Sequence, residues 1–388
     1  MKIFYSFIVL LGASFEYYIY MLFAFSLPFL TSVFVGTDAI KAGYLILFLS
    51  SIFRPLGGFL IGGLGDKYSR EYAIFFAMMM MSFSTILLVI LPSYAKIGIY
   101  STILLITIRI IQVASVAGEH TGSAIFLIEQ MQGTNKVKRD GLASGISYFF
   151  TMLGTLMATV GNYYSNIENF RYAFLIGALL FFIAILIKLL PNEGVKIKKI
   201  QEEVEPDAFW KNFFACFLMS AGMSGMFYYN IIFLTNFFES IIDPILVKQY
   251  KVYYLLIYLF SVLIAGFISD YLKKFYLMLY MPLLLALLAL PTILFQSLLF
   301  HIINIVVLAL YVGPSHASLY KIFSKKHKYK SVSAAYSLGT AFIGSFTPYV
   351  CKYIQDNLHT VFSSFWLIFL CLLSIVGCLL QKKRLMQD

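Results

Sequence analysis

Charged residues are scarce in this sequence. Only 12% of its 388 residues are Asp, Glu, Lys or Arg, whereas 61% belong to the hydrophobic set. Soluble globular domains have about a quarter charged and about half apolar residues, so this composition excludes an ordinary water-soluble enzyme and a basic nucleic-acid-binding protein. Apolar runs of about 18 or more residues recur along the chain, and each is long enough to cross a bilayer. The sequence therefore predicts a polytopic membrane protein.

Residues for catalysis, metal binding and phosphate binding are also few. The four cysteines all fall inside apolar runs, which argues against a disulfide framework. Glu119-His120 lacks the spacing of a zinc-binding His-Glu-x-x-His helix, so we expect no metal site. The glycines at 62–65 do not form a phosphate-binding loop, which excludes ATP-driven transport. No Ser-His-Asp arrangement supports a hydrolase. We expect neither an enzyme nor a cofactor, with a proton gradient as the driving force.

The apolar runs define about twelve spans. The longest polar stretch, 192–207, follows the sixth of them and has the composition of a linker. We expect an all-α membrane protein with an N-terminal six-helix half at 1–190, a cytoplasmic linker at 191–209 and a C-terminal six-helix half at 210–388. The approximate limits of the spans are 4–33, 42–62, 72–92, 97–128, 142–163, 170–190, 210–238, 249–270, 275–295, 297–320, 331–354 and 359–380.

The positive charge follows the order of these spans. Lys and Arg exceed Asp and Glu by 29 to 18, and most of the basic residues fall in segments that alternating spans place on one side of the membrane. Basic residues mark the cytoplasmic side of membrane proteins. The net charge of +11 therefore reflects topology. We expect a multi-pass protein of a plasma membrane, a bacterial inner membrane, with both termini in the cytoplasm.

A short motif occurs twice, at corresponding positions of the two predicted halves. Gly62 to Arg70 follows the second span and Gly266 to Lys274 follows the eighth, and both read Gly-x-x-x-Asp-x-x-x-basic. Two matches at equivalent helix boundaries favour duplication of a six-helix unit, which is the layout of major facilitator transporters. The motif residues with a candidate functional role are Gly62, Asp66, Lys67, Arg70, Asp270 and Lys274.

The first copy lies in a longer signature. Arg54-Pro55-Leu56-Gly57-Gly58 precedes it, and the stretch 54–70 resembles the second-to-third-helix signature of the major facilitator superfamily, in the form typical of its metabolite:proton symporter branch. That branch includes proline/betaine, α-ketoglutarate, citrate and shikimate transporters. Three further segments are similar to the branch, in the first, fourth and eleventh spans: Phe15–Tyr18, Arg109–Glu129 and Tyr336–Pro348.

This resemblance implies a fold and a function. The fold would be two pseudo-symmetric six-helix bundles, and the function would be import of a small polar metabolite, an organic acid or a betaine/proline-like osmolyte, by proton symport with alternating access. In the family, the Asp and basic residues of the loop hold helices together on the cytoplasmic side, which gives the motif residues a gating role. One departure is Ile19, which stands where the branch usually has an Asp.

Ionisable residues inside the predicted spans are the candidates for the transport site. Charges at bilayer depth normally face a cavity and pair. On the fourth span Arg109, Gln112 and Glu119 fall within an arc of about 100°, a polar stripe on an otherwise apolar helix. We expect Glu119, assisted by Glu16, to carry the coupling proton. We expect the substrate to be bound by these residues: Arg109, Arg54, Gln112, Tyr18 and Tyr336. Further candidates for the pocket wall are Tyr17, Tyr20, Tyr228, Tyr229 and Asn230.

Two other readings remain open at this point. A proton-coupled exporter of amphipathic compounds would have a larger apolar pocket and fewer intramembrane arginines than Arg54 and Arg109 provide. A non-transporting receptor or relic of the fold is favoured by Ile19 and disfavoured by the retained Glu16 and Glu119. In either case the expected partners are a small molecule, H⁺ and the lipid bilayer, with no nucleic acid, and the expected state is a monomer.

Overall fold

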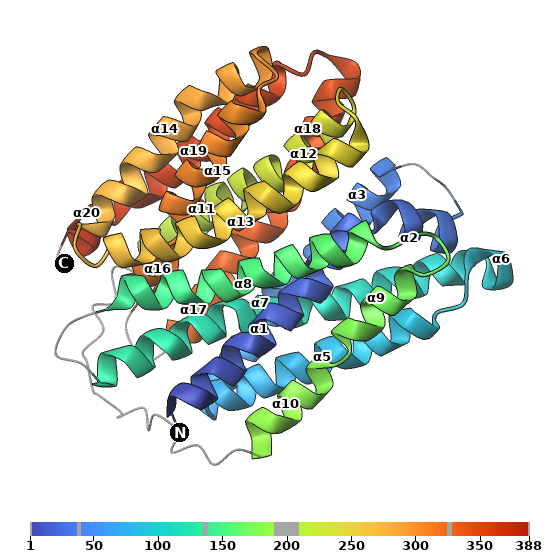
Figure 1. Ribbon diagram of the computed structural model, residues 1–388. Coiled ribbons are helices and arrows are strands. Elements are labelled where there is room, and N and C mark those ends of the chain that lie inside the picture. The colour runs from blue at the N-terminus through green and yellow to red at the C-terminus, as the bar shows by residue number, and fades with distance from the viewer. Residues whose placement is uncertain (1, 37–39, 135–138, 190–208, 324–327, 387–388) are drawn as a thin grey trace.

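The computed structural model describes residues 2–36, 40–134, 139–189, 209–323 and 328–386, and these residues form helices and short connections without a strand (Figure 1). The N-terminal half, as we use the term, comprises the helices α1(Lys2–Phe25), α2(Leu27–Phe34), α3(Ile40–Ser51), α4(Arg54–Lys67), α5(Arg70–Ile90), α6(Tyr94–Ile97), α7(Ile99–Thr134), α8(Asp140–Tyr163), α9(Phe170–Gly177) and α10(Leu180–Leu189).

The C-terminal half contains two π-helical segments, η2 and η4, in addition to its α-helices. Its elements are α11(Phe209–Tyr228), η2(Tyr229–Phe233), α12(Leu234–Glu239), α13(Pro244–Ile268), α14(Lys274–Leu294), α15(Leu298–Val312), α16(Ser315–Ile322), α17(Lys328–Gly339), η4(Thr340–Gly344), α18(Thr347–Asn357), α19(Phe362–Leu380) and α20(Lys382–Leu385).

Eleven helical segments of the described chain are long and apolar enough to cross a membrane. The expected span at 331–354 is not among them, because there the chain is broken into α17, the π-helical η4 and α18, which starts with Thr347-Pro348. Taken together, these three elements form the twelfth helix, so the count agrees with the twelve-helix fold expected from the sequence. The predicted linker lies outside the described residues except for Phe209, and the domain limits stay a prediction.

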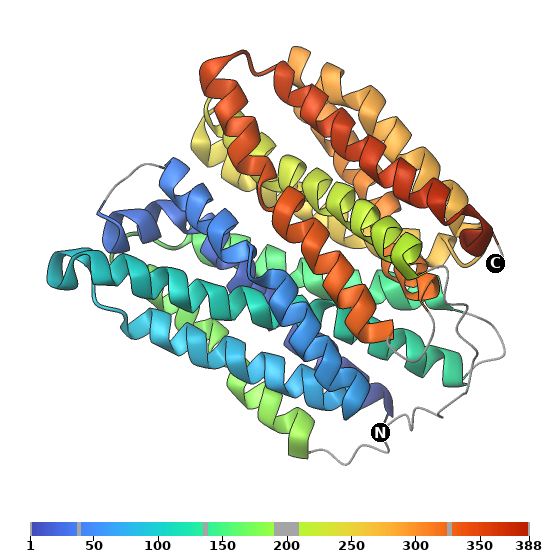
Figure 2. The ribbon, with the colours of Figure 1, turned by 180° about the vertical axis from the view of Figure 1, so that it is seen from behind.

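The two halves pack against each other through two pairs of helices. Helix α4 lies beside α17, and α8 lies beside α13, so that each pair joins one helix from each half (Figures 1 and 2). The N- and C-terminal ends of the chain lie at the same end of this bundle. Helices α3 and α18 reach the opposite end (Figure 1).

Glycine makes these contacts close. A Cβ on Gly62 of α4 would lie 2.9 Å from the Cα of Lys330 in α17. A Cβ on Gly145 of α8 would lie 2.9 Å from the Cα of Gly266 in α13. Small residues let helix backbones approach where lipid supplies no hydrophobic driving force for association. The glycines of the repeated motif therefore sit where the two halves touch.

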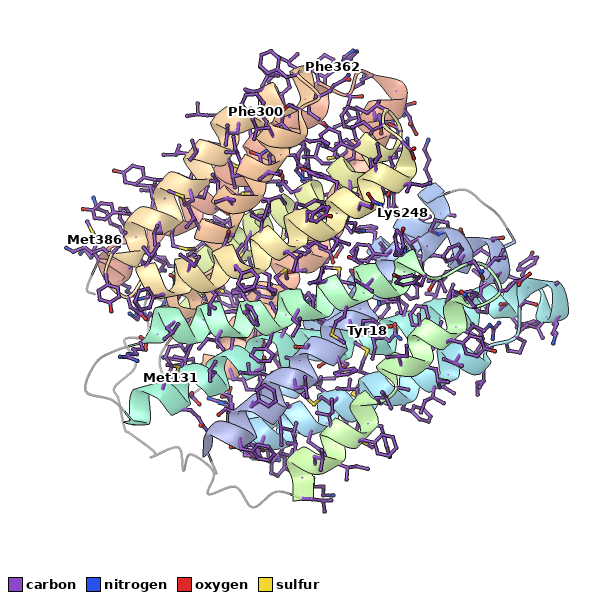
Figure 3. All side chains as sticks on the ribbon, viewed as in Figure 1. Tyr18, Met131, Lys248, Phe300, Phe362 and Met386 are labelled. Atoms are coloured by element: carbon purple, nitrogen blue, oxygen red, sulfur yellow. The ribbon has the colours of Figure 1, made fainter. Side chains whose placement is uncertain are left out.

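The outer surface is covered by large apolar side chains (Figure 3). Leu287 is 74% exposed and Phe83 is 62% exposed, on helices that face away from the other half. A soluble protein of this size rarely exposes a continuous apolar surface, whereas a bilayer accepts it. The ionisable residues of the predicted transport site, such as Glu16, Arg54 and Glu119, are instead buried between the helices.

Candidate functional site

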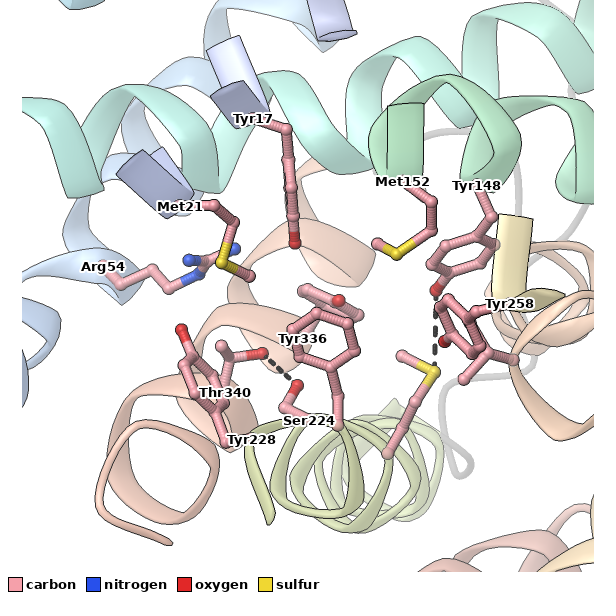
Figure 4. A pocket seen from close by; sticks show the side chains of 13 residues that line it. Tyr17, Met21, Arg54, Tyr148, Met152, Ser224, Tyr228, Tyr258, Tyr336 and Thr340 are labelled. Atoms are coloured by element: carbon pink, nitrogen blue, oxygen red, sulfur yellow. Dashed lines mark hydrogen bonds between the residues drawn. The ribbon is translucent and has the colours of Figure 1, made fainter. Parts of the chain in front are cut away.

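A small cavity lies between the two halves of the bundle (Figure 4). Its wall takes residues from α1, α4 and α8 on one side and from α11, α13, α15, α17 and η4 on the other. Only one of the lining residues is charged, and most are aromatic or sulfur-containing. They are Tyr17, Met21, Arg54, Tyr148, Met152, Met223, Ser224, Phe227, Tyr228, Tyr258, Val312, Tyr336 and Thr340.

Arg54 supplies the charge of this cavity. It begins α4, just before Pro55, and its side chain is 1% exposed. Its Nη1 donates a hydrogen bond of 3.2 Å to the hydroxyl of Tyr20, whereas its Nε and Nη2 have no partner. A buried guanidinium with free N–H groups is costly unless an anion completes its hydrogen bonds. Arg54, which the sequence predicts to bind substrate, therefore lines the cavity with two nitrogen atoms that have no hydrogen-bonding partner.

Tyrosine rings form most of the remaining wall. Figure 4 shows Tyr17, Tyr148, Tyr258 and Tyr336 around the open space, with Tyr228 next to Arg54. Tyr336 is thus a predicted residue that the structure places in the wall. Aromatic faces attract cations, most strongly when water is excluded. The cavity accordingly offers one positive centre for an anionic group and several ring faces for a cationic one.

Arg109 and Gln112 lie behind the wall. The Arg109 guanidinium stacks on the rings of Tyr20 and Phe23, at 4.5 Å and 4.1 Å from their centroids. Its Nη1 donates to Oε1 of Gln112 at 3.2 Å, and Gln112 donates to Thr85 at 3.3 Å. Neither residue lines the cavity. The sequence predicted direct substrate contacts for both, and in the structure they hold Tyr20, which in turn contacts Arg54.

Tyr18 also lies outside the cavity, contrary to the sequence-based expectation. Its hydroxyl donates to the carbonyl of Ala173 in α9 at 2.7 Å, and its ring packs near Gly161. Consecutive residues of a helix point about 100° apart, so α1 can present only one of two neighbouring tyrosines to the cavity. The residue it presents is Tyr17.

The two predicted proton-carrying residues lie together. Glu16 and Glu119 are both 0% exposed, and their carboxyl groups lie within hydrogen-bonding reach of each other. Glu16 accepts a hydrogen bond from the Ser115 hydroxyl, but its Oε2 and both oxygens of Glu119 have no donor. Two adjacent carboxyl groups that lack donors are satisfied when they share a proton. Glu16 also immediately precedes Tyr17 of the cavity wall.

The first copy of the repeated motif joins the halves at the end that carries the termini. Asp66 accepts a hydrogen bond of 2.5 Å from Nη1 of Arg70 and one of 2.9 Å from the backbone N–H of Lys330. Lys330 lies in the first turn of α17, where the helix dipole favours a carboxylate. Arg70 also pairs with Glu129 at 3.3 Å. Lys67, by contrast, is exposed and lies over the ring of Tyr68.

The second copy makes the symmetric contact. Asp270 accepts hydrogen bonds from the backbone N–H groups of Gly141 at 2.7 Å and Leu142 at 2.9 Å, at the start of α8. Lys274 is 4% exposed at the start of α14, near Asp270. Burial raises the pKa of Asp270, while the two N–H groups act in the opposite direction. Each motif Asp thus caps a helix of the other half.

The opposite end of the bundle is also closed between the halves. Lys41 of α3 and Asp356 of α18 form an ion pair of 2.7 Å. Farther along the same two helical segments, the rings of Phe48 and Phe346 lie 4.6 Å apart between centroids. Lys251 of α13 lies over the ring of Phe25, at the end of α1. The two halves are thus in contact at both ends of the bundle.

The chain resembles known proteins in sequence. Residues 9–348 match the family model described as Major Facilitator Superfamily. A proline/betaine transporter of Salmonella typhimurium (strain LT2) is 46% identical over 78 residues, which are 20% of this chain and 16% of that protein. A putative proline/betaine transporter of Staphylococcus aureus (strain COL) is 33% identical over 114 residues, 29% of this chain and 24% of that protein. These matches cover less than a quarter of each relative.

Solved structures resemble the whole fold. The proton:xylose symporter XylE, bound to 6-bromo-6-deoxy-D-glucose, superposes with a TM-score of 0.76 at 15% identity, covering 98% of this chain and 94% of that one. The human organic anion transporter MFSD10 (TETRAN) gives a TM-score of 0.71 at 15% identity, with 97% and 98% covered. At this identity the likeness concerns the fold. Together with the family match over most of the chain, it identifies this protein as a membrane transporter, not an enzyme, that belongs to the major facilitator superfamily.

Proposed function

We propose that this transporter imports a small zwitterionic solute of the betaine or proline type together with a proton. The curated relatives that match parts of the chain are named as proline/betaine transporters, and a structural neighbour is a proton:xylose symporter. The protein would lie in a bacterial plasma membrane as a monomer, with both termini in the cytoplasm.

The substrate class is inferred from one feature of the cavity: the Arg54 side chain and several aromatic rings line the same space. The unpartnered Nε and Nη2 of Arg54 suit a carboxylate, which can accept two N–H groups at once. The rings of Tyr17, Tyr148 and Tyr336 suit the ammonium group of the same small molecule. An organic acid with two carboxylates would meet only one cation in this wall, so we place it second.

Glu119 and Glu16 are proposed as the proton-coupling pair. A shared proton would bridge two of the three carboxyl oxygens that lack donors, and its loss would leave two buried negative charges side by side. Such a pair changes its interactions sharply on protonation, which is what coupling to transport requires. The proposal places coupling next to the cavity even though Ile19 replaces the acidic residue that is usual in the branch.

Gating would be carried by the two motif contacts. Asp66 with Lys67 and Arg70, and Asp270 with Lys274, would hold the cytoplasmic ends of the helices together and release them when the cavity opens inward. The glycine at position 62 would allow α4 and α17 to meet during closure. The ion pair of Lys41 and Asp356 would close the outer end.

The proposal is tested by reconstitution into liposomes with an imposed pH gradient, acidic outside. Labelled glycine betaine and proline should accumulate, whereas labelled dicarboxylates and choline, which lacks a carboxylate, should not. Arg54→Gln should abolish uptake, while Lys383→Gln, a change of an exposed basic residue outside the cavity wall and the repeated motif, should leave uptake unchanged. Accumulation of dicarboxylates alone would favour the organic acid reading. Export of amphipathic dyes, or no transport at all, would favour the two remaining alternatives.

A further inference from the structure

Two histidines that have no part in the proposed coupling pair meet across the interface of the halves. His120 of α7 and His316 of α16 are 2% and 3% exposed, and their ring centroids lie 4.8 Å apart. His120 comes from the N-terminal half and His316 from the C-terminal half. The Nε2 of His316 has no hydrogen-bonding partner. Two imidazole rings are therefore buried in contact with each other at the interface between the halves.

Tyrosines surround the pair, and three of the contacts there cross between the halves. The Nε2 of His120 lies 3.1 Å from the hydroxyl of Tyr336 in α17. The ring of His316 stacks on Tyr148 of α8 with centroids 4.4 Å apart and an interplanar angle of 12°. Ser315 donates to the same Tyr148 hydroxyl at 2.9 Å. Because Tyr148 and Tyr336 also line the cavity, the histidines lie directly behind its wall.

The pair lies on the side of the cavity that faces the end with the termini. Helix α7 continues from His120 toward that end, and one residue on, Thr121 contacts Ser333 of α17. Nearby, the Tyr329 hydroxyl donates to the carbonyl of Gly118 at 2.7 Å. These contacts belong to the same α4, α7 and α17 packing that Asp66 closes. The two histidines therefore lie between the cavity wall and the contacts that close this end.

We propose that His120 and His316 form a proton-sensitive latch, closed while at most one ring is charged and opened toward the cytoplasmic end when both are protonated. The inference rests on the proposed function for its place in the transport cycle. A single imidazolium can be held by the tyrosine faces that surround the pair. A second one places two like charges in contact across the halves, and they repel strongly where little water screens them.

The charges that face the pair favour this behaviour. From α4, Arg54 adds a further positive charge near His120, and so disfavours a doubly charged pair in the closed state. Among the described residues, negative charge beside the pair comes from the proposed coupling pair: Glu119 directly precedes His120 on α7 and would share its proton with Glu16 of α1. Farther along α16, Lys321 is already paired with Asp140 at 3.6 Å. The other titratable groups that pack against the two rings are Tyr17, Tyr148 and Tyr336.

The latch needs two protons of its own, one on each ring, in addition to the proton that the coupling pair carries. Histidine ordinarily changes charge near neutral pH, but burial disfavours the charged form, so both rings take up protons only as the halves begin to separate. Separation of the halves then exposes both rings to the cytoplasm, where they lose their protons. The closed arrangement is restored once the rings are neutral, and the empty transporter can reset.

The test measures the separation of the halves without any solute. Spin labels are placed at Tyr72→Cys and Tyr271→Cys, which are 48% and 75% exposed at the end with the termini, after the four buried native cysteines are replaced by alanine. Distance distributions are recorded in lipid nanodiscs at about pH 8 and about pH 5.5, on either side of the usual histidine pKa. The population at long distance should rise at least several-fold on acidification.

Five variants distinguish the latch from neighbouring groups. His120→Gln combined with His316→Gln should lose the pH response, and each single variant should lose most of it, because one ring cannot repel itself. His301→Gln is the matched control: His301 is 0% exposed but bonds Tyr250 and Asn230 within one half, so the response should persist. Glu119→Gln should also retain it.

A wild-type response in a folded single or double histidine variant would overturn the latch, as would an absence of any pH response in the wild-type protein. Loss of the response in Glu119→Gln would assign it to the carboxyl pair instead. Because no solute is present, none of these results depends on the transported substrate. Failure of solute uptake with an intact distance response would contradict the proposed function and leave the latch standing.

Discussion

Gly62 controls how closely α4 and α17 can approach, and alanine at this position should weaken closure of the cytoplasmic end. The added Cβ would lie 2.9 Å from the Cα of Lys330 and 3.3 Å from its backbone nitrogen. Both atoms belong to the backbone of α17, so the overlap is relieved only when one helix moves away from the other. Overpacking of this kind costs about 1–3 kcal/mol.

The neighbouring Gly63 provides a matched control, because nothing lies within 4 Å of a Cβ built on it. Alanine is more favourable than glycine inside a helix by up to about 1 kcal/mol, and this gain applies to both positions. The difference between the two variants therefore isolates the clash across the halves. A cost of about 1–3 kcal/mol shifts the ratio of closed to open molecules by about 5- to 150-fold.

The assay is the distance between spin labels at Tyr72→Cys and Tyr271→Cys. Gly62→Ala should enrich the long-distance population relative to Gly63→Ala, and Gly63→Ala should match the protein with its native glycine. Membrane insertion should be normal in both, because it depends on apolar length and basic flanks. Equal distance distributions in the two variants would refute the view that the α4–α17 contact sets closure.

Three further predictions follow from the charged residues. Asp66→Asn should slow transport at normal membrane abundance, since a neutral amide loses the charge-assisted hydrogen bonds to Arg70 and Lys330; a wild-type rate would make Asp66 a simple loop residue. Glu119→Gln should abolish pH-driven accumulation but spare solute exchange, and accumulation against a gradient would place the proton elsewhere. Lys41 holds the pKa of Asp356 below its usual value through their hydrogen bond, so the stability that this pair contributes is lost only as the pH falls through that lowered pKa. Spin labels at the outer end, at Tyr100→Cys and Leu358→Cys, should thus keep their separation between about pH 8 and about pH 5. Their separation should respond to salt, which screens the ion pair. A pH-dependent change of the separation in this window would argue against the ion pair.

Much of the fold follows from the sequence because it depends on features that local pattern records. Apolar length predicts the spans, and the repeated Gly-x-x-x-Asp motif predicts which helix ends are equivalent. The structure adds what each Asp contacts: Asp66 caps α17 and Asp270 caps α8, each in the other half. The backbone partners of these carboxylates leave no mark in the sequence, because any residue has an N–H group to offer.

The cavity wall was harder to predict because burial on α1 is nearly uniform. Tyr17, Tyr18 and Tyr20 are all less than 9% exposed, so hydrophobicity does not reveal which of them faces the cavity. Arg109 was expected to bind substrate because a buried cation needs a partner. Its partners are the rings of Tyr20 and Phe23, and ring faces next to a cation have no sequence signature of their own.

The contact of His316 with His120 could not be predicted from the sequence either. A histidine next to a proline at a helix start is not informative by itself, and its contact with His120 joins helices far apart in the chain. Only the packing of α7 against α16 brings the two rings together. Contacts between the halves are therefore the part of the site that sequence patterns record least.

Proton movement during solute entry tests the central claim most directly. Purified protein is reconstituted into liposomes with no initial pH gradient, and glycine betaine is added outside while an electrode records the external pH. The account predicts alkalinisation of the external medium that accompanies entry of the solute, that is abolished by a protonophore and that is absent in Glu119→Gln. Entry of labelled solute with no proton movement would contradict it.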